Sequence, residues 1–247
     1  MNNTGLNINV FRTREEMGAA AGRDIETKIN ELLSVREEVR MIFAAAPSQN
    51  EVLDYLASSH IIDWGRVTAF HMDEYIGLKA GAEQLFSVFL REKLFDKVKM
   101  KSVYLIDSES DITNEIDRYS TLINQAPIDI VCLGIGENGH IAFNDPPVAD
   151  FNDPLTIKKV RLDHLCRLQQ VNDGCFLSLN DVPEEALTLT IPVLFNASHL
   201  FCVVPGGRKR NAVHNTIYGP VENSCPASIL QRHPDCRFYF DTSSFGE

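Results

Sequence analysis

The chain has 247 residues and a formal net charge of −11, with 44% hydrophobic and 23% charged residues. An acidic protein repels phosphate backbones and anionic lipid surfaces, so we expect neither nucleic-acid nor membrane binding, although a local pocket can still hold a small phosphorylated molecule. No apolar stretch approaches the roughly 18 residues of a membrane span, no signal peptide is recognisable, and the scattered cysteines indicate reduced core thiols. We therefore expect a cytoplasmic protein, without a disulfide framework or a zinc site.

The predicted elements alternate between amphipathic helices and short apolar strands. In chain order we expect a helix over 14–34, a strand over 39–46, a helix over 50–58, a strand over 66–72, helices over 81–94 and 111–125, and strands over 128–134, 199–205 and 236–240. Apolar strands separated by helices are typical of a parallel sheet covered on both faces. The pattern predicts a single domain over 1–247, of the α/β class, with a doubly wound, mostly parallel, Rossmann-like sheet.

Ligands of such sheets bind beyond the carboxyl ends of the strands, so the segments after Ala46, Met72, Leu133 and Val204 should share one site. The first of these segments leads into a helix, whose free N–H groups suit a phosphate. Its residues Ser48 and Gln49 are therefore candidate phosphate-binding residues. Polar residues also begin ordinary helices, and for this segment alone simple capping is the better interpretation.

The second segment places two adjacent carboxylates, Asp73 and Glu74, directly after an apolar strand. A carboxylate that faces a cleft can act as a general base, because burial or a neighbouring negative charge raises its pKa toward neutrality. The alternative interpretation is that Asp73 caps a turn while Glu74 is solvated.

The third segment combines glycines with polar residues after a buried strand. Its glycines, Gly134, Gly136 and Gly139, allow a tight turn and a close approach to a ligand. His140 lies in this turn, and a histidine titrates near neutrality, where a carboxylate can orient it. The spacing differs from the dinucleotide-binding pattern. The complete string indicates a functional loop more strongly than a histidine alone would.

The fourth segment, Pro205–Asn211, has two glycines followed by three consecutive cations at the start of a helix. Cations at this end of a helix oppose the helix dipole, and a bound anion would remove the conflict. Lys209 is the best candidate for a phosphate partner. The alternative is a solvated run of charges.

Two motifs are similar to those of a known enzyme family. The sequence resembles the glucosamine-6-phosphate deaminase and 6-phosphogluconolactonase superfamily in two long segments, Phe70–Leu78 and Gly134–Asn144. Shorter matches occur at 186–190, 207–209 and 228–233. The resemblance covers most of the chain. The sequence after His140 is closer to the deaminase branch than to the lactonase branch.

The resemblance implies a reaction and a role for each matching residue. His140 would open the pyranose ring, and Asp73 would take the proton from C2, so that isomerisation and loss of ammonia by cleavage of the C–N bond can follow. Asp145 would hold His140, Asn138 occupies a position where the family has Asp or Asn, and Lys209 would bind the phosphate. The substrate would be a small sugar phosphate, and no metal or organic cofactor is implied. Members of this type are often homo-oligomers. The remaining residues expected at the substrate are Ser48, Gln49, Glu74, Gly136, Gly139 and Arg167.

Three departures from the family pattern concern the residues that hold the substrate. The segment Ala46–Asn50 lacks the glycines of the family's phosphate loop, and Asp145 replaces a glutamate. No residue of this chain corresponds securely to the arginine that binds the phosphate in the family. Arg167 lies close to that position in the sequence, and Gln170 or Asn172 falls at it. The hexosamine is therefore left open between the glucosamine and galactosamine types. A sugar-phosphate lactonase and a sensor without turnover are the alternatives to a deaminase.

Overall fold

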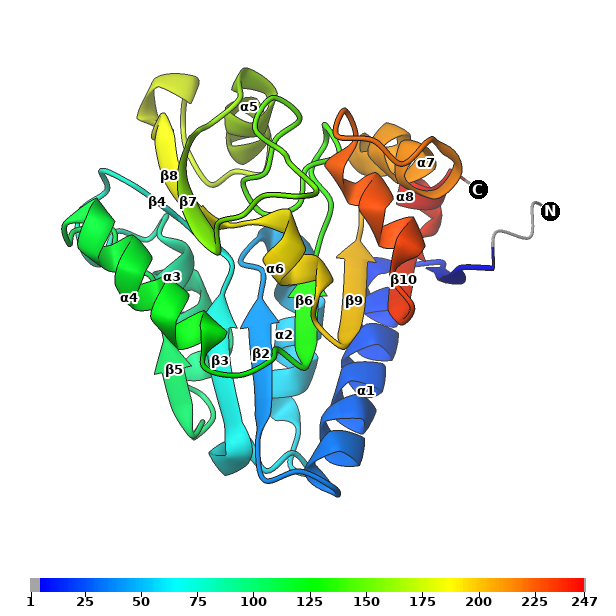
Figure 1. Cartoon of the computed structure of the whole chain (residues 1–247). Coiled ribbons are helices and arrows are strands. Elements are labelled where there is room, and N and C mark those ends of the chain that lie inside the picture. The colour runs from blue at the N-terminus through cyan, green and yellow to red at the C-terminus, as the bar shows by residue number, and fades with distance from the viewer. Residues whose placement is uncertain (1–4, 247) are drawn as a thin grey trace.

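The computed structural model describes residues 5–246 (Figure 1). Its main sheet contains seven parallel strands in the order β1-β10-β9-β6-β2-β3-β5. These strands are β1 (Asn7–Phe11), β10 (Cys236–Asp241), β9 (His199–Val204), β6 (Ile130–Leu133), β2 (Val39–Phe43), β3 (Val67–His71) and β5 (Ser102–Tyr104). A second sheet is antiparallel, with the order β4-β8-β7, and contains β4 (Asp73–Tyr75), β8 (Glu185–Leu189) and β7 (Ile157–Arg161).

Helices cover both faces of the main sheet. They are α1 (Arg14–Leu33), α2 (Asn50–Ser58), α3 (Phe86–Leu90), α4 (Ile112–Asn124), α5 (His164–Asn172), α6 (Ile191–Phe195), α7 (Arg210–Tyr218) and α8 (Thr242–Phe245). The strand β2 illustrates the two cores, because Met41 and Phe43 pack with α1 and α2, whereas Ile42 packs with residues of α4 and α6 on the other face. The molecule therefore has the doubly wound α/β fold that the alternating pattern predicted.

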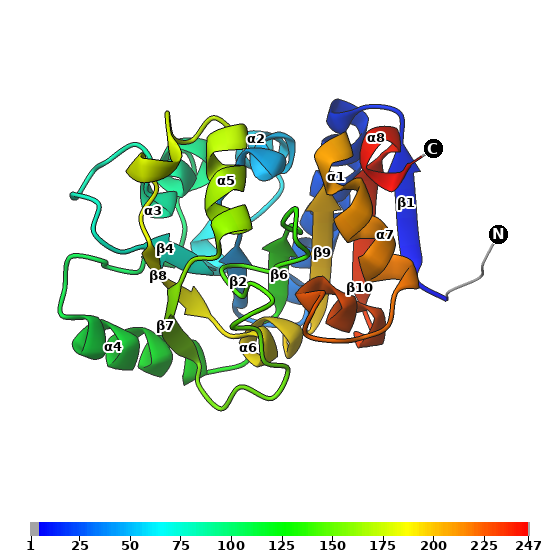
Figure 2. The same cartoon turned by 90° about the horizontal axis from the view of Figure 1, so that it is seen from above.

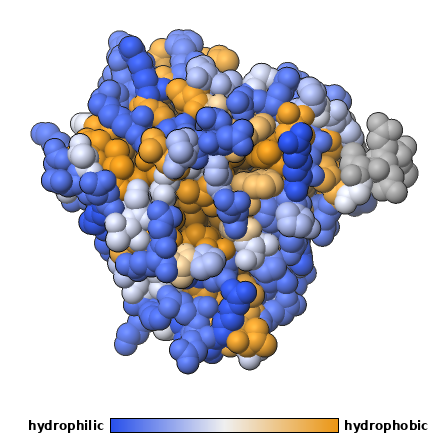
Figure 3. Space-filling model, in the orientation of Figure 1, coloured by the Kyte–Doolittle hydropathy of each residue, from blue (hydrophilic) through white to orange (hydrophobic). Residues whose placement is uncertain are grey.

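The two views show how these layers are arranged. Helices α1 and α2 lie behind the sheet in Figure 1, and α4 and α6 lie in front of it. Seen from above, α5 and the second sheet lie beside the carboxyl ends of the central strands (Figure 2). The front face is mostly hydrophilic, with apolar residues gathered in its middle (Figure 3). Among residues 5–246, no helix combines the length and the apolar character that a membrane crossing requires.

The five predicted strands and three of the four predicted helices are present. The predicted helix over 81–94 is the exception, because α3 begins only at Phe86 and continues as a π-helical turn over Arg91–Phe95. The edge strands β1 and β5 were not predicted, and β4 lies where the sequence indicated a loop. Strand β7 was also missed, because it is half exposed and alternates polar with apolar residues instead of forming an apolar run.

Candidate active site

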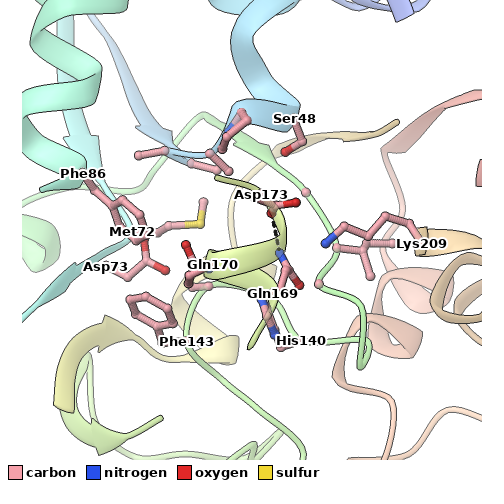
Figure 4. Close-up of a pocket in the computed structure, with 18 of the residues that line it drawn as sticks. Ser48, Met72, Asp73, Phe86, His140, Phe143, Gln169, Gln170, Asp173 and Lys209 are labelled. Carbon is pink, nitrogen blue, oxygen red and sulfur yellow. Dashed lines mark hydrogen bonds between the residues drawn. The ribbon is translucent and has the colours of Figure 1, made fainter. Parts of the chain in front are cut away.

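A pocket lies at the carboxyl ends of the central strands, as the sheet rule predicted. All four predicted segments contribute to it. They supply Ala44–Ser48 after β2, Met72 and Asp73 after β3, Gly134–Gly136 after β6, and Pro205 with Lys209 after β9. In Figure 4, Asp73 lies on one side of the pocket and Lys209 on the other, with residues of α5 between them.

Asp73 is the first residue of β4 and is 6% exposed, with its carboxylate in the pocket. Strand β4 pairs with β8, where Asp73 lies opposite Thr188, so the second sheet determines the direction of this side chain. The pocket wall beside it is apolar, because Phe86 and Phe143 stack with ring centroids 5.5 Å apart. Burial, and then the negative charge of Glu74, raise the pKa of Asp73 well above its usual value.

Glu74 does not lie in the pocket, and in this respect the sequence prediction is wrong. Side chains alternate between the two faces of a strand, so Glu74 points away from the pocket when its neighbour Asp73 points into it. The fully buried carboxylate accepts hydrogen bonds from the N–H groups of Tyr75 and Phe86, both at 3.0 Å, and of Ser87 at 2.8 Å. Glu74 therefore joins the start of α3 to β4, which is why the helix begins at Phe86.

His140 forms a buried cluster with two other predicted residues. Its Nδ1 lies 3.0 Å from Oδ1 of Asp145, the separation of an ion pair, although the ring is not aligned for a straight hydrogen bond. The Asn138 amide donates to the same Asp145 oxygen at 2.9 Å, and the Asn138 side-chain oxygen accepts from the His140 N–H at 3.1 Å. Burial on its own would raise the pKa of Asp145, but His140 and Asn138 outweigh burial and hold it below its usual value.

The loop glycines position this cluster. A Cβ atom on Gly136 would lie only 2.2–2.4 Å from three atoms of the His140 ring, so the ring packs directly on the Gly136 backbone. Gly139 has a φ of 86°, in the left-handed region that favours glycine. Gly136 lines the pocket as predicted, whereas Gly139 shapes the turn and packs against Cys225 instead of lining the pocket.

The far end of the pocket contains the predicted phosphate-binding residues Lys209 and Ser48. Lys209 is 7% exposed, and burial lowers the pKa of its ammonium group. Within residues 5–246, no acceptor makes a hydrogen bond or a salt bridge with its Nζ atom. Ser48 lines the pocket, whereas Gln49 lies behind it and donates through Nε2 to Val203 O and to Ser48 Oγ, both at 3.2 Å. Gln49 thus ties the loop to β9.

Arg167 does not lie in the pocket, which corrects a further sequence prediction. Its guanidinium donates to the carbonyls of Leu179 at 2.8 Å and Val182 at 2.7 Å, on another face of α5. Two or three residues further along α5, Gln169 and Gln170 face the pocket, because successive residues of a helix point about 100° apart.

The sequence reasoning missed several pocket residues. Asp173, which follows α5, accepts a hydrogen bond at 3.3 Å from Gln169, and its charge acts on Lys209. Arg14 lines the rim, where Glu51 and the carbonyl of Pro47 fix its guanidinium. Asp173 follows a helix, and Arg14 follows β1, an edge strand that was not predicted, so a search at the ends of the predicted strands finds neither residue.

The site can therefore carry out proton transfer next to an anion-binding position. A shielded carboxylate of raised pKa is suited to be a general base, and the carboxylate-supported His140 is suited to move a second proton. The buried cation Lys209 provides a counter-charge for an anionic group. Such an arrangement fits a reaction that removes a proton beside a carbonyl of a phosphorylated substrate.

Comparisons with known proteins agree with this chemistry. The profile of the glucosamine-6-phosphate isomerase and 6-phosphogluconolactonase family matches residues 12–153. A glucosamine-6-phosphate deaminase of Exiguobacterium sibiricum is 39% identical over 185 residues, which cover 73% of this chain and 70% of that protein. A glucosamine-6-phosphate deaminase of Bacillus cereus is 34% identical over 231 residues, which cover 93% of this chain and 84% of that protein.

Solved structures give the same result for the fold. A monomeric glucosamine-6-phosphate deaminase of the NagB superfamily superposes with a TM-score of 0.88 at 25% identity, covering 98% of this chain and 99% of that chain. A 6-phosphogluconolactonase of Thermotoga maritima has a TM-score of 0.78 at 19% identity, covering 96% and 99%, which shows a shared fold alone. The family profile and the identities of the curated deaminases together establish that the chain belongs to the family of glucosamine-6-phosphate isomerases and 6-phosphogluconolactonases.

Proposed function

We propose that this protein converts a hexosamine 6-phosphate, of the glucosamine or galactosamine type, to a ketose 6-phosphate and ammonia. The proposal rests chiefly on the buried carboxylate of Asp73, which lines the same pocket as His140 and the buried cation Lys209. The curated relatives named above are glucosamine-6-phosphate deaminases, which supports an amino sugar as the substrate.

The reaction begins with opening of the sugar ring. His140 carries the proton of the C1 hydroxyl to the ring oxygen, so that the bond between C1 and the ring oxygen breaks and an aldehyde forms. Asp145 and Asn138 hold the His140 ring and its backbone in place for this step. The carboxylate of Asp145 also stabilises the imidazolium while it carries the proton.

Isomerisation and loss of ammonia follow. Asp73 removes the proton from C2 while the aldehyde oxygen takes up a proton, which gives an enol-type intermediate, and Asp73 then returns its proton to C1 as the amino nitrogen loses a proton to solvent. The product is an imine at C2, and addition of water followed by cleavage of the C–N bond releases ammonia and leaves a ketose. The apolar wall of Phe86 and Phe143 shields Asp73 from water, which helps to keep its pKa high enough for it to accept a proton.

Lys209 and Ser48 hold the phosphate of the substrate at the other end of the pocket. The ammonium group of Lys209 makes no hydrogen bond or salt bridge within residues 5–246, so a bound phosphate would give this buried charge a direct partner. The carboxylate of Asp173 is close enough to influence Lys209. This carboxylate disfavours a phosphate in its immediate vicinity and therefore restricts where the phosphate can lie.

The test is a panel of hexosamine and hexose 6-phosphates, assayed for ammonia release and for ketose formation. We expect ammonia from at least one hexosamine 6-phosphate, and exchange of the C2 proton with deuterated solvent. The Asp73→Asn variant should lose this exchange while still binding the substrate, and His140→Gln should impair cyclic substrate far more than an open-chain analogue. Hydrolysis of a sugar-phosphate lactone without ammonia release from any hexosamine 6-phosphate would contradict the proposal.

A further inference from the structure

A buried thiol, Cys166 of α5, lies next to the cluster of His140 and Asp145. A ring nitrogen of His140, a carboxylate oxygen of Asp145 and the Sγ atom of Cys166 all lie within 4.8 Å of one another. All three residues are buried, with exposures of 8% for His140 and 1% for each of the others. The mechanism above assigns no step to Cys166, and its side chain does not line the pocket.

The Nδ1 atom of His140 is the least satisfied of these three groups. The side chain is 10% exposed, and no described residue makes an aligned hydrogen bond with Nδ1, although Asp145 lies 3.0 Å away. The Gly136 backbone holds the ring against the other two groups. A ligand that accepts the lone pair of this nitrogen would therefore meet a carboxylate and a thiol that are already in place.

An imidazole, a carboxylate and a thiol form a typical set of ligands for zinc. Ligand atoms around a tetrahedral zinc ion lie about 3.3–3.6 Å apart, given bond lengths of about 2.0 Å to nitrogen and oxygen and 2.3 Å to sulfur. Ligand atoms that lie within 4.8 Å of one another must therefore move inward by about 1 Å to bind a zinc ion. We expect the ion to enter from the pocket, because His140 is the member of the cluster that lines it.

We propose that His140, Asp145 and Cys166 form an inhibitory zinc site. Binding of Zn²⁺ forms a bond to each of the three side chains and displaces two protons to solvent, that of the Cys166 thiol and the one that His140 Nδ1 shares with Asp145. The lone pair of His140 that faces Asp145 is then occupied by the metal, so the histidine can no longer carry a proton to the ring oxygen. The binding itself does not depend on the proposed function, whereas the inhibition does.

The experiment compares the purified full-length protein with Cys166→Ser and Cys166→Ala variants. Titration with Co²⁺, a spectroscopic substitute for Zn²⁺, should give a thiolate-to-cobalt charge-transfer band in the unmodified protein, which stoichiometric Zn²⁺ abolishes. Both variants should lose the band and bind Zn²⁺ at least about tenfold more weakly. A matched control is Cys175→Ser, which removes a partly buried thiol outside the cluster and should leave the band and the affinity unchanged.

Ammonia release then tests the inhibition. Micromolar Zn²⁺ should inhibit the unmodified protein and Cys175→Ser, with recovery on addition of a chelator, whereas the two Cys166 variants should resist it. A band that persists in the Cys166 variants, or equal zinc affinity in all proteins, would overturn the proposed site. Absence of ammonia release with a normal cobalt band would instead refute the proposed function and leave the metal site supported.

Discussion

The two adjacent carboxylates after β3 have different surroundings and therefore different roles. Glu74 accepts three backbone N–H groups, which lower its pKa, although burial raises the pKa by more. Among residues 5–246 no such donor compensates Asp73, so burial and the neighbouring charge of Glu74 both raise its pKa. Glu74, on the opposite face of the same short strand, thus helps to raise the pKa of the carboxylate that we propose as the general base.

We expect Glu74→Gln to move the acid limb of the pH profile of kcat/KM to lower pH. In the proposed mechanism the activity depends on ionised Asp73, so it increases as the pH rises through the pKa of Asp73. Removal of the Glu74 charge lowers that pKa, and the base is then ionised at a lower pH. The measurement is kcat/KM for ammonia release across the pH range in which the variant stays folded.

The control for this shift is Glu185→Gln, which removes a carboxylate whose side chain is 47% exposed on β8. Its acid limb should coincide with that of the unmodified protein. The glutamine at position 74 cannot accept all three N–H groups, so the Glu74→Gln variant should also unfold at a lower denaturant concentration. If the stability falls while the acid limb stays in place, the charge of Glu74 does not act on the general base.

At the scale of elements, buried side chains satisfy helix ends that would otherwise lack partners. Helix α4 ends at Asn124, and the guanidinium of Arg40 on β2 donates to the carbonyls of Leu122 at 2.6 Å, Ile123 at 3.2 Å and Ala126. Arg40 is 8% exposed, and its guanidinium also lies 4.9 Å from the centre of the Phe70 ring. Arg40 therefore joins α4 to the centre of the sheet.

Arg40→Met should destabilise the fold by about 2–4 kcal/mol, because the last carbonyls of α4 lose a charged donor and stay buried. KM should change little, since Arg40 is near the amino end of β2 and the pocket is at the carboxyl end. Chemical denaturation measures the stability. The matched control, Arg161→Met, removes a side chain that is 79% exposed and should leave the midpoint almost unchanged. Equal midpoints for the two variants would show that Arg40 does not hold α4.

At the scale of the whole molecule, the pocket is lined by the main sheet, the second sheet and α5 together. The main sheet supplies the loops after β2, β6 and β9, the second sheet supplies Asp73, and α5 supplies Gln169 and Gln170. A substrate that touches all of them binds only the folded arrangement. Its binding energy therefore adds to the stability of the whole molecule.

We expect a hexosamine 6-phosphate to raise the Tm of the Asp73→Asn variant, which binds the substrate without consuming it. At about 100 times Kd the gain is about 2.7 kcal/mol, or roughly 5–10 °C for a chain of this size. A variant with both Asp73→Asn and Lys209→Met should show a much smaller increase at the same concentration. An equal increase with the unphosphorylated hexosamine would show that the phosphate contributes nothing to binding.

The class of fold, and the edge of the sheet at which the pocket lies, could be predicted from the amino-acid sequence alone. Both depend on local signals: buried strands of a parallel sheet are apolar throughout, and polar or glycine residues directly after such strands stand out. Asp73, His140 and Lys209 were found in this way, whereas the roles of Asn138 and Asp145 came from the family resemblance. The structure places them together because the carboxyl ends of parallel strands meet at one edge.

Which of the residues adjacent in sequence face the pocket could be seen only in the tertiary structure. Glu74 was expected at the substrate but points the other way, because β4 is a strand in a sheet that the local sequence pattern did not reveal. Arg167 was likewise expected in the pocket, whereas α5 turns Gln169 and Gln170 toward it instead. Asp173 lines the pocket, and Cys166 lies next to His140 and Asp145. Neither residue follows a predicted strand, so the sequence pattern did not point to them. The direction of a side chain depends on partners distant in sequence, and no local pattern records it.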